Sequence, residues 1–235
     1  MEGNKTEKEI EVALRRCAET HLSFSYPWNG LEDFLKDAGR NSLALIGYGS
    51  LINQKSAGRT INVDGSANRL PVMAYGAIRV FNYRMTPNLL IERYGTPRSS
   101  KYIAALNCEL TGNAKDQFNG ILTQVDLDSL EPLRGREKEY GLKPVVYHSW
   151  GDSAGKMEVA YILELLPDQD AEFHRYDSKI LPHIQYTKLC QEGALAISQS
   201  FLEFFNETCF LGDKVTNLSS CSLPDVDPDS LDSKC

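Results

Sequence analysis

Strand-like segments separated by turns constrain the fold of this chain more than any other feature of its sequence. Residues 43–46 form a compact apolar run suited to a buried strand, and turn-forming clusters separate the later strand-like runs. These runs do not alternate regularly with helices, which disfavours a TIM barrel or a Rossmann fold. We therefore predict an α+β fold, a small mixed β-barrel with flanking helices and an N-terminal helical extension. The later strands are predicted at 72–84, 102–110, 118–126, 143–150 and 157–165, with 151–155 as a hairpin loop.

Helical patterns occupy both ends of the chain and one segment among the strands. Residues 7–22 carry one apolar stripe, typical of an amphipathic helix. This stripe either caps the barrel or makes a dimer contact, and capping is favoured because a small barrel has exposed apolar ends. We predict further helices at 31–38 with Gly39 as C-cap, at 126–140 with Asp126 or Asp128 as N-cap, and at 182–206.

Composition excludes several classes of function. The 235 residues hold 25 Lys and Arg against 32 Asp and Glu, a net charge of -7, which speaks against nucleic acid as a partner. No apolar run is long enough to span a membrane, and the charged N-terminus lacks a secretory signal. We therefore expect a cytoplasmic protein with reduced thiols and no membrane partner. The predicted organisation is an N-terminal helical extension (1–40), one domain (41–218) and a disordered acidic tail (219–235).

We predict no metal site and no cofactor. The six cysteines include no C-x-x-C pair, and the four histidines include no H-x-x-H or H-E-x-x-H pair. The segment Gly47-Tyr48-Gly49-Ser50 lacks the third glycine of a dinucleotide fingerprint and the Gly-Lys of a P-loop. Its serine follows the second glycine, so it is not a nucleophile elbow either.

The glycine-rich loop could nevertheless hold an anion. A tight turn in which glycine adopts positive φ lets a ligand approach successive backbone N–H groups, which bind carboxylate or phosphate. The competing interpretation is a turn that only ends a strand. A second candidate is a carboxylate near the predicted helix 126–140, where burial would raise the pKa of a general base. Spacing leaves Glu137 and Glu139 equally eligible, because the two would project about 200° apart on a helix.

Four segments together resemble the γ-glutamylcyclotransferase-like superfamily, which includes the ChaC-type glutathione-degrading enzymes. They are Gly47-Tyr-Gly-Ser-Leu-Ile52 after a strand, Leu133-x-x-Arg136-Glu137-x-x-Tyr140, Arg79-Val-Phe-Asn-Tyr-Arg84, and Tyr186-x-x-x-Cys190-x-x-Gly193. The likeness covers about residues 43–218. The chain departs from the pattern in the spacing of Glu137 and Tyr140, one residue shorter than usual, and in the unmatched loop 86–101.

The resemblance implies a transferase or lyase that cyclises a γ-glutamyl compound to 5-oxoproline and releases an amine. It implies Glu137 as the acid/base and the amides of Gly49, Ser50 and Leu51 as the site for the substrate carboxylate. The partner would be a small γ-glutamyl molecule: glutathione, a γ-glutamyl amino acid or a γ-glutamyl amine on a larger carrier. Candidates to line the pocket, or to be core aromatics instead, are Tyr48, Tyr140 and Tyr186, whereas Arg79 would pair with substrate, with Glu137 or in a structural ion pair.

Two other functions remain open for this sequence. A catalytically silent member of the fold would be a binding or regulatory module that uses the same cavity. An acyltransferase would pass the γ-glutamyl group to an external acceptor.

Overall fold

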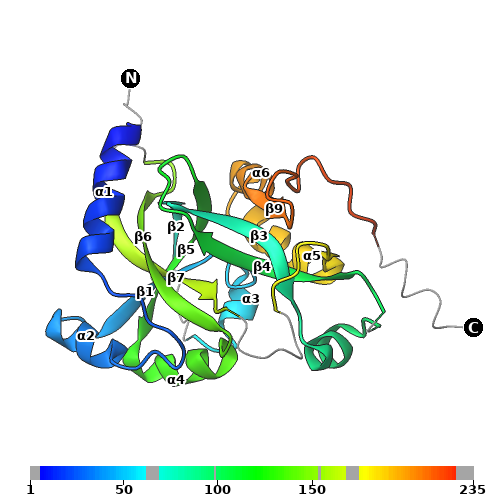
Figure 1. The fold of residues 1–235 in the computed structure, drawn as a ribbon, viewed down its shortest axis with the longest axis horizontal. Coiled ribbons are helices and arrows are strands. Elements are labelled where there is room, and N and C mark those ends of the chain that lie inside the picture. The colour runs from blue at the N-terminus through cyan, green and yellow to red at the C-terminus, as the bar shows by residue number, and fades with distance from the viewer. Residues whose placement is uncertain (1–5, 62–68, 98, 153–154, 168–174, 226–235) are drawn as a thin grey trace, which may run out of the picture. The chain divides into compact units, whose positions relative to one another are not determined.

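The structure, a computed structural model, describes residues 6–61, 69–97, 99–152, 155–167 and 175–225. Most of the predicted acidic tail, residues 226–235, therefore lies outside the described residues, as do residues 153–154 of the predicted hairpin loop. The contacts within the chain divide it into two units, residues 1–78 with 108–166 and residues 79–107 with 167–235 (Figure 1). The three-part organisation expected from the sequence remains a prediction.

The first unit is built on a ring of five strands. Their order is β1-β5-β2-β6-β7, with antiparallel pairing at every step along that order. The ring closes through one parallel residue pair, Leu45 of β1 with Tyr161 of β7. The pairing between the first and last strands is therefore shorter than a fully closed barrel would have. The strands are β1 (Ser42–Gly47), β2 (Arg69–Tyr75), β5 (Gln117–Asp126), β6 (Tyr140–Ser149) and β7 (Glu158–Leu165).

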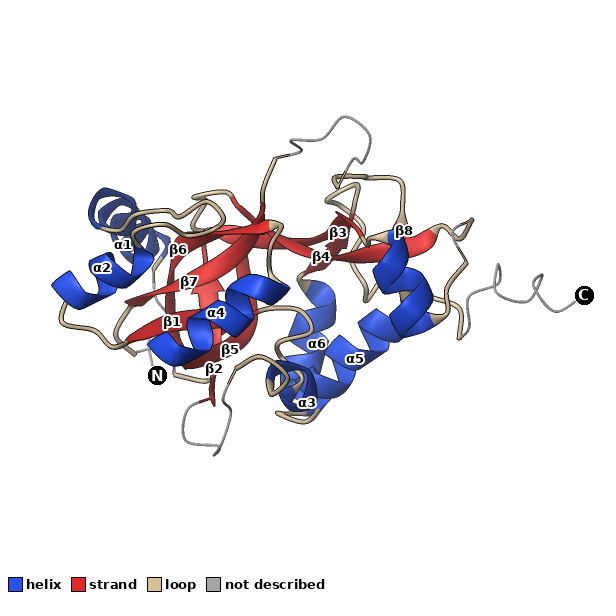
Figure 2. Cartoon of the chain, turned by 90° about the horizontal axis from the view of Figure 1, so that it is seen from below, coloured by secondary structure: helices blue, strands red, loops and turns tan. Residues whose placement is uncertain are grey.

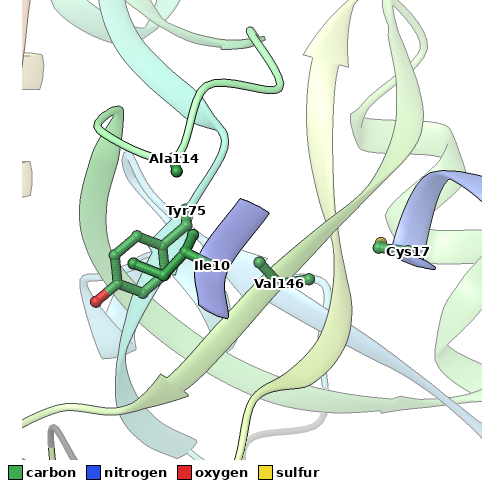
Figure 3. Close-up of a cluster of buried hydrophobic side chains, with 5 residues drawn as sticks. All are labelled: Ile10, Cys17, Tyr75, Ala114 and Val146. Atoms are coloured by element: carbon green, nitrogen blue, oxygen red, sulfur yellow. The ribbon is translucent and has the colours of Figure 1, made fainter. Parts of the chain in front are cut away.

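Four helices belong to the first unit. Helix α1 lies along β6, and Ile10 and Cys17 on its buried side join a cluster with Tyr75, Ala114 and Val146 (Figures 1 and 3). Ile10 and Cys17 of the predicted apolar stripe are therefore covered within their own unit, whereas Leu22 at its end is exposed. The helices are α1 (Glu7–Thr20), α2 (Leu31–Asp37), α3 (Gln54–Ala57) and α4 (Leu127–Arg136).

The described part of the second unit contains a smaller sheet, two α-helices and a short π-helix (Figure 2). The chain enters this unit through β3 and leaves it through β4, and the strands of the sheet pair in the order β8-β4-β3-β9. Residues 86–101, which matched no known pattern, contain a short π-helix, η2. The elements are β3 (Ala77–Arg84), η2 (Leu89–Tyr94), β4 (Tyr102–Leu110), β8 (Leu181–Pro182), α5 (Ile184–Leu195), α6 (Gln199–Glu207) and β9 (Cys209–Leu211).

Two predicted elements are each divided in the structure. The strand expected at 72–84 is two strands, because Gly76 adopts a φ of 83° and turns the chain between them. The helix expected at 182–206 is two helices, because Ser198 is extended and its side chain accepts a hydrogen bond from the N–H of Phe201 to cap the second helix. The helix expected at 126–140 ends at Arg136, four residues early.

Candidate active site

The glycine-rich loop leaves the end of β1 through a tight turn. The N–H of Ile52 donates to the carbonyl of Gly49 at 2.9 Å, which places Ser50 and Leu51 at the centre of the turn. Gly47 is required for a reason that the sequence did not indicate. We expected glycine to adopt a positive φ in this loop, but the φ of Gly47 is not positive. Instead, a Cβ at this position would lie 2.6 Å from the Cβ of Leu51. Only glycine therefore lets the turn fold back on the strand this closely.

The turn presents three successive backbone N–H groups. Those of Gly49, Ser50 and Leu51 have no hydrogen-bond partner within the part of the chain that the structure describes. On the other side of the turn, Arg69 at the start of β2 donates to the carbonyls of Leu51 and Ile52, at 2.6 and 3.0 Å. The carbonyls are thus held by a cation while adjacent N–H groups stay available to an anion.

Arg136, the last residue of α4, connects this loop to the neighbouring carboxylate. Its Nη2 donates to the Oγ of Ser50 at 3.0 Å and to the Oγ of Ser56 at 3.4 Å. Its Nη1 donates to the carbonyl of Ser56 at 2.9 Å and to the Oγ1 of Thr60 at 3.1 Å. Its Nε lies 2.8 Å from the Oε1 of Glu137. All five guanidinium N–H groups are therefore engaged by the protein itself.

Glu137 forms the C-cap of α4, and its side chain is 13% exposed. Burial raises the pKa of its carboxyl, the Arg136 guanidinium counteracts this rise, and the charge of Glu139 adds to it. The C-terminal end of a helix also disfavours a negative charge. Oε1 is held by Arg136, whereas Oε2 has no hydrogen-bond partner among the described residues. A carboxyl with a raised pKa is suited to take up and release a proton in general acid/base catalysis.

Aromatic residues of the first unit support this region. The hydroxyl of Tyr48 donates to the carbonyl of Leu163 at 2.6 Å, and its ring packs edge-on against Phe118. Tyr140 is buried at the start of β6, and its N–H donates to the carbonyl of Glu137 at 3.0 Å. Both rings thus lie within the core next to the proposed site, and their assignment as pocket-lining groups stays a prediction.

The segment before β1 also supports the carboxylate. Trp28 is fully buried, and its indole N–H donates to the carbonyl of Tyr140 at 2.9 Å. Phe24 pairs with Leu142 further along the same strand. Residues that lie outside the family resemblance therefore fix the beginning of β6, three residues from Glu137.

The remaining two predicted site residues, Arg79 and Tyr186, belong to the second unit. Arg79 is fully buried; its Nη2 donates to the carbonyl of Phe205 at 3.3 Å and to the Oγ1 of Thr208, and its guanidinium lies over the Phe205 ring. Tyr186, in the first turn of α5, is buried edge-on to Phe81. The first unit alone brings together Glu137 and the loop 48–51.

Sequence reasoning did not assign a role to Arg136, Arg69, Ser56 or Thr60. Arg136 stood in the matched pattern only as the residue before the glutamate. A pattern gives the order of residues along the chain, whereas the partners of Arg136 other than Glu137 lie 76 to 86 positions away.

Within the described residues, no group of three or more His, Cys, Asp or Glu side chains could hold a metal ion. In the same residues no helix is both long and apolar enough to cross a membrane.

Comparison with known proteins finds likeness in structure only. No protein-family model matches the chain, and no curated protein matches it in sequence. The chain is similar to YkqA from Bacillus subtilis (16% identity, TM-score 0.49), with 73% of this chain aligned to 55% of YkqA. It is also similar to a human protein described as uncharacterized protein loc79017 (12% identity, TM-score 0.49, 83% and 98% of the two chains). A protein described as gamma-glutamyl cyclotransferase aligns at 14% identity and TM-score 0.49, over 82% and 97% of the two chains.

Proposed function

We propose that the chain is a γ-glutamylcyclotransferase-type enzyme, which converts a γ-glutamyl compound into 5-oxoproline and a free amine. One observation carries the proposal. A carboxylate whose pKa is raised by burial is joined through a single arginine to a turn whose three N–H groups have no hydrogen-bond partner among the residues that the structure describes. A substrate of such a site would carry a carboxylate that the turn can bind and a group that exchanges a proton with Glu137. A γ-glutamyl group has both, in its α-carboxylate and its α-amine.

The turn would bind the α-carboxylate of the substrate. The N–H groups of Gly49, Ser50 and Leu51 are the donors, and the hydroxyl of Ser50 adds a fourth. Because the Oγ of Ser50 accepts a hydrogen bond from Arg136, its own proton is free to point toward the ligand. Holding the carboxylate here would fix one end of the γ-glutamyl group and favour its folded conformer, which is the main requirement of an intramolecular attack.

Glu137 would then carry the proton from one nitrogen to the other. Its carboxylate takes a proton from the α-amine, whose lone pair attacks the γ-carbonyl carbon and closes a five-membered ring. The resulting carboxyl gives that proton to the departing nitrogen as the bond from the γ-carbon to this nitrogen breaks. The products are 5-oxoproline and the amine, and the enzyme returns to its starting protonation state. Oε2, the oxygen that Arg136 does not hold, is suited to both transfers.

The experiment is to incubate the full chain with glutathione, γ-glutamyl amino acids and a γ-glutamyl amine, and to identify the products by mass spectrometry. We expect 5-oxoproline and the free amine in equal amounts from at least one substrate. A γ-glutamyl group found on an added acceptor would indicate transfer instead. Ligand-induced stabilisation with no product from any substrate would indicate a silent binding module and overturn the proposal.

A further inference from the structure

We propose that Arg136 is a positioning residue that sets the basicity of Glu137 and the shape of the carboxylate-binding turn together, without touching the substrate. This inference rests on the proposed function. It begins from the number of donors on the guanidinium group. The five N–H groups of an arginine are matched by five acceptors: one on Glu137, one on Ser50, two on Ser56 and one on Thr60.

This saturation separates Arg136 from a substrate-binding arginine. A guanidinium that clamps a substrate carboxylate keeps a pair of N–H groups free for it. Arg136 has none free, and its side chain is 19% exposed. Its hydrogen bonds instead join three segments: the end of α4, the turn at Ser50, and the short helix α3 with the residues that follow it. A displacement of the turn would therefore also displace the acid/base.

Two charged groups act on Glu137 in opposite directions. Arg136 lowers the pKa of the Glu137 carboxyl and Glu139 raises it, while burial raises it most. Removing the charge of Arg136 should therefore raise that pKa further. Replacing the guanidinium with a group that keeps the positive charge but lacks the several N–H donors should disturb the position of the turn more than the pKa of Glu137. The two effects can be separated by two substitutions.

The test compares R136Q, R136K and the control R134Q. Arg134 lies on the same helix, but among the described residues its hydrogen bonds and ion pairs are with Glu32 and Glu131 and not with the turn. We expect R136Q to raise KM for the γ-glutamyl substrate roughly tenfold to a hundredfold and to move the acid limb of kcat/KM to higher pH. R136K should raise KM while its acid limb stays near that of the wild type, since lysine keeps the charge but not the fork. R134Q should change neither.

A readout that needs no turnover keeps the two proposals apart. The carboxyl carbon of Glu137 can be titrated by NMR in the wild type, R136Q and R136K, and we expect a higher pKa in R136Q alone. If R136Q folds poorly, R136K still tests the effect on KM. An unshifted titration in folded R136Q, or a KM unchanged in R136K, would overturn the positioning role. Absence of 5-oxoproline from the wild type would instead overturn the proposed function, whatever the titration shows.

Discussion

Glu137 and Glu139 are two residues apart, yet their positions differ in the property that matters for proton transfer. Glu137 caps α4, is mostly buried and has a raised pKa, and one of its oxygens is unpartnered in the described chain. The sequence could not choose between the two by spacing, because the helix was expected to run to residue 140. The early end of α4 at Arg136 invalidates that helical projection.

The raised pKa of Glu137 predicts a pH-dependent effect of E137Q on stability. The pKa of a glutamate in an unfolded chain is about 4.3, and the pKa of Glu137 in the folded protein is higher. At pH values between the unfolded and folded pKa, the folded state therefore binds a proton that the unfolded state does not. This contribution is present below the unfolded pKa and is lost as the pH rises through the folded pKa. Relative to the wild type, E137Q should therefore become more stable as the pH rises from about 4 through the folded pKa of Glu137.

Thermal unfolding of both proteins across this pH range measures the effect. E131Q is the matched control, because Glu131 lies on α4 and its carboxylate is 80% exposed beside Arg134. It should show no such gain. If E137Q instead lost stability relative to the wild type as the pH rises, the result would contradict the conclusion that burial raises the pKa of Glu137.

At the scale of elements, local patterns located most of the strands and the first two helices. The alternation of apolar residues and the turn clusters are local signals, and β4, β5 and β7 begin and end within one residue of their predicted ranges. The errors arose where a single residue interrupts a pattern, as Gly76 and Ser198 do. The short strands β8 and β9 exist only through pairing with distant strands, which no local pattern contains.

The turn after β1 gives a prediction at this scale. In G47A the new Cβ would meet the Cβ of Leu51 at 2.6 Å and its carbonyl carbon at 3.2 Å, so the turn must shift. We expect a loss of about 1–3 kcal/mol in the free energy of unfolding and a higher KM for the γ-glutamyl substrate. Urea unfolding and steady-state kinetics measure the two effects.

G135A is the matched control for this substitution. Gly135 lies within α4, and a Cβ there would meet nothing within 4 Å. Alanine should therefore stabilise the helix by about 0.5–1 kcal/mol and leave KM unchanged. Equal behaviour of the two variants would show that the close approach of Gly47 to Leu51 is not required.

At the scale of the whole molecule, the candidate site residues fall in two units. Glu137, Tyr140 and residues 48–51 belong to the first, whereas Arg79 and Tyr186 belong to the second. The resemblance that selected these residues compares only their order along the chain, so it does not indicate which of them belong to the same unit. The assignment of Glu137 as the acid/base and of residues 48–51 as the anion loop stays a prediction, and the sequence did not indicate that Arg136 joins the two.

Arg79 gives a prediction at this scale. It is fully buried in the second unit, where it bonds to the carbonyl of Phe205 and to Thr208 and lies 4.3 Å from the centre of the Phe205 ring. R79M should therefore lower the free energy of unfolding by about 2–4 kcal/mol, and substrate affinity should change little. Chemical unfolding with parallel KM measurements tests this. Unchanged stability with a large rise in KM would place Arg79 at the substrate instead.

The central claim is that Glu137 transfers the proton during cyclisation. It is tested most directly by the rate of 5-oxoproline release from E137Q, measured against the wild type and E131Q, with circular dichroism to establish that each protein is folded. We expect kcat/KM of E137Q to fall by roughly a hundredfold to ten-thousandfold, with E131Q close to the wild type. A folded E137Q that keeps more than about a tenth of the wild-type kcat/KM would contradict the claim, since loss of a general acid/base costs far more than that.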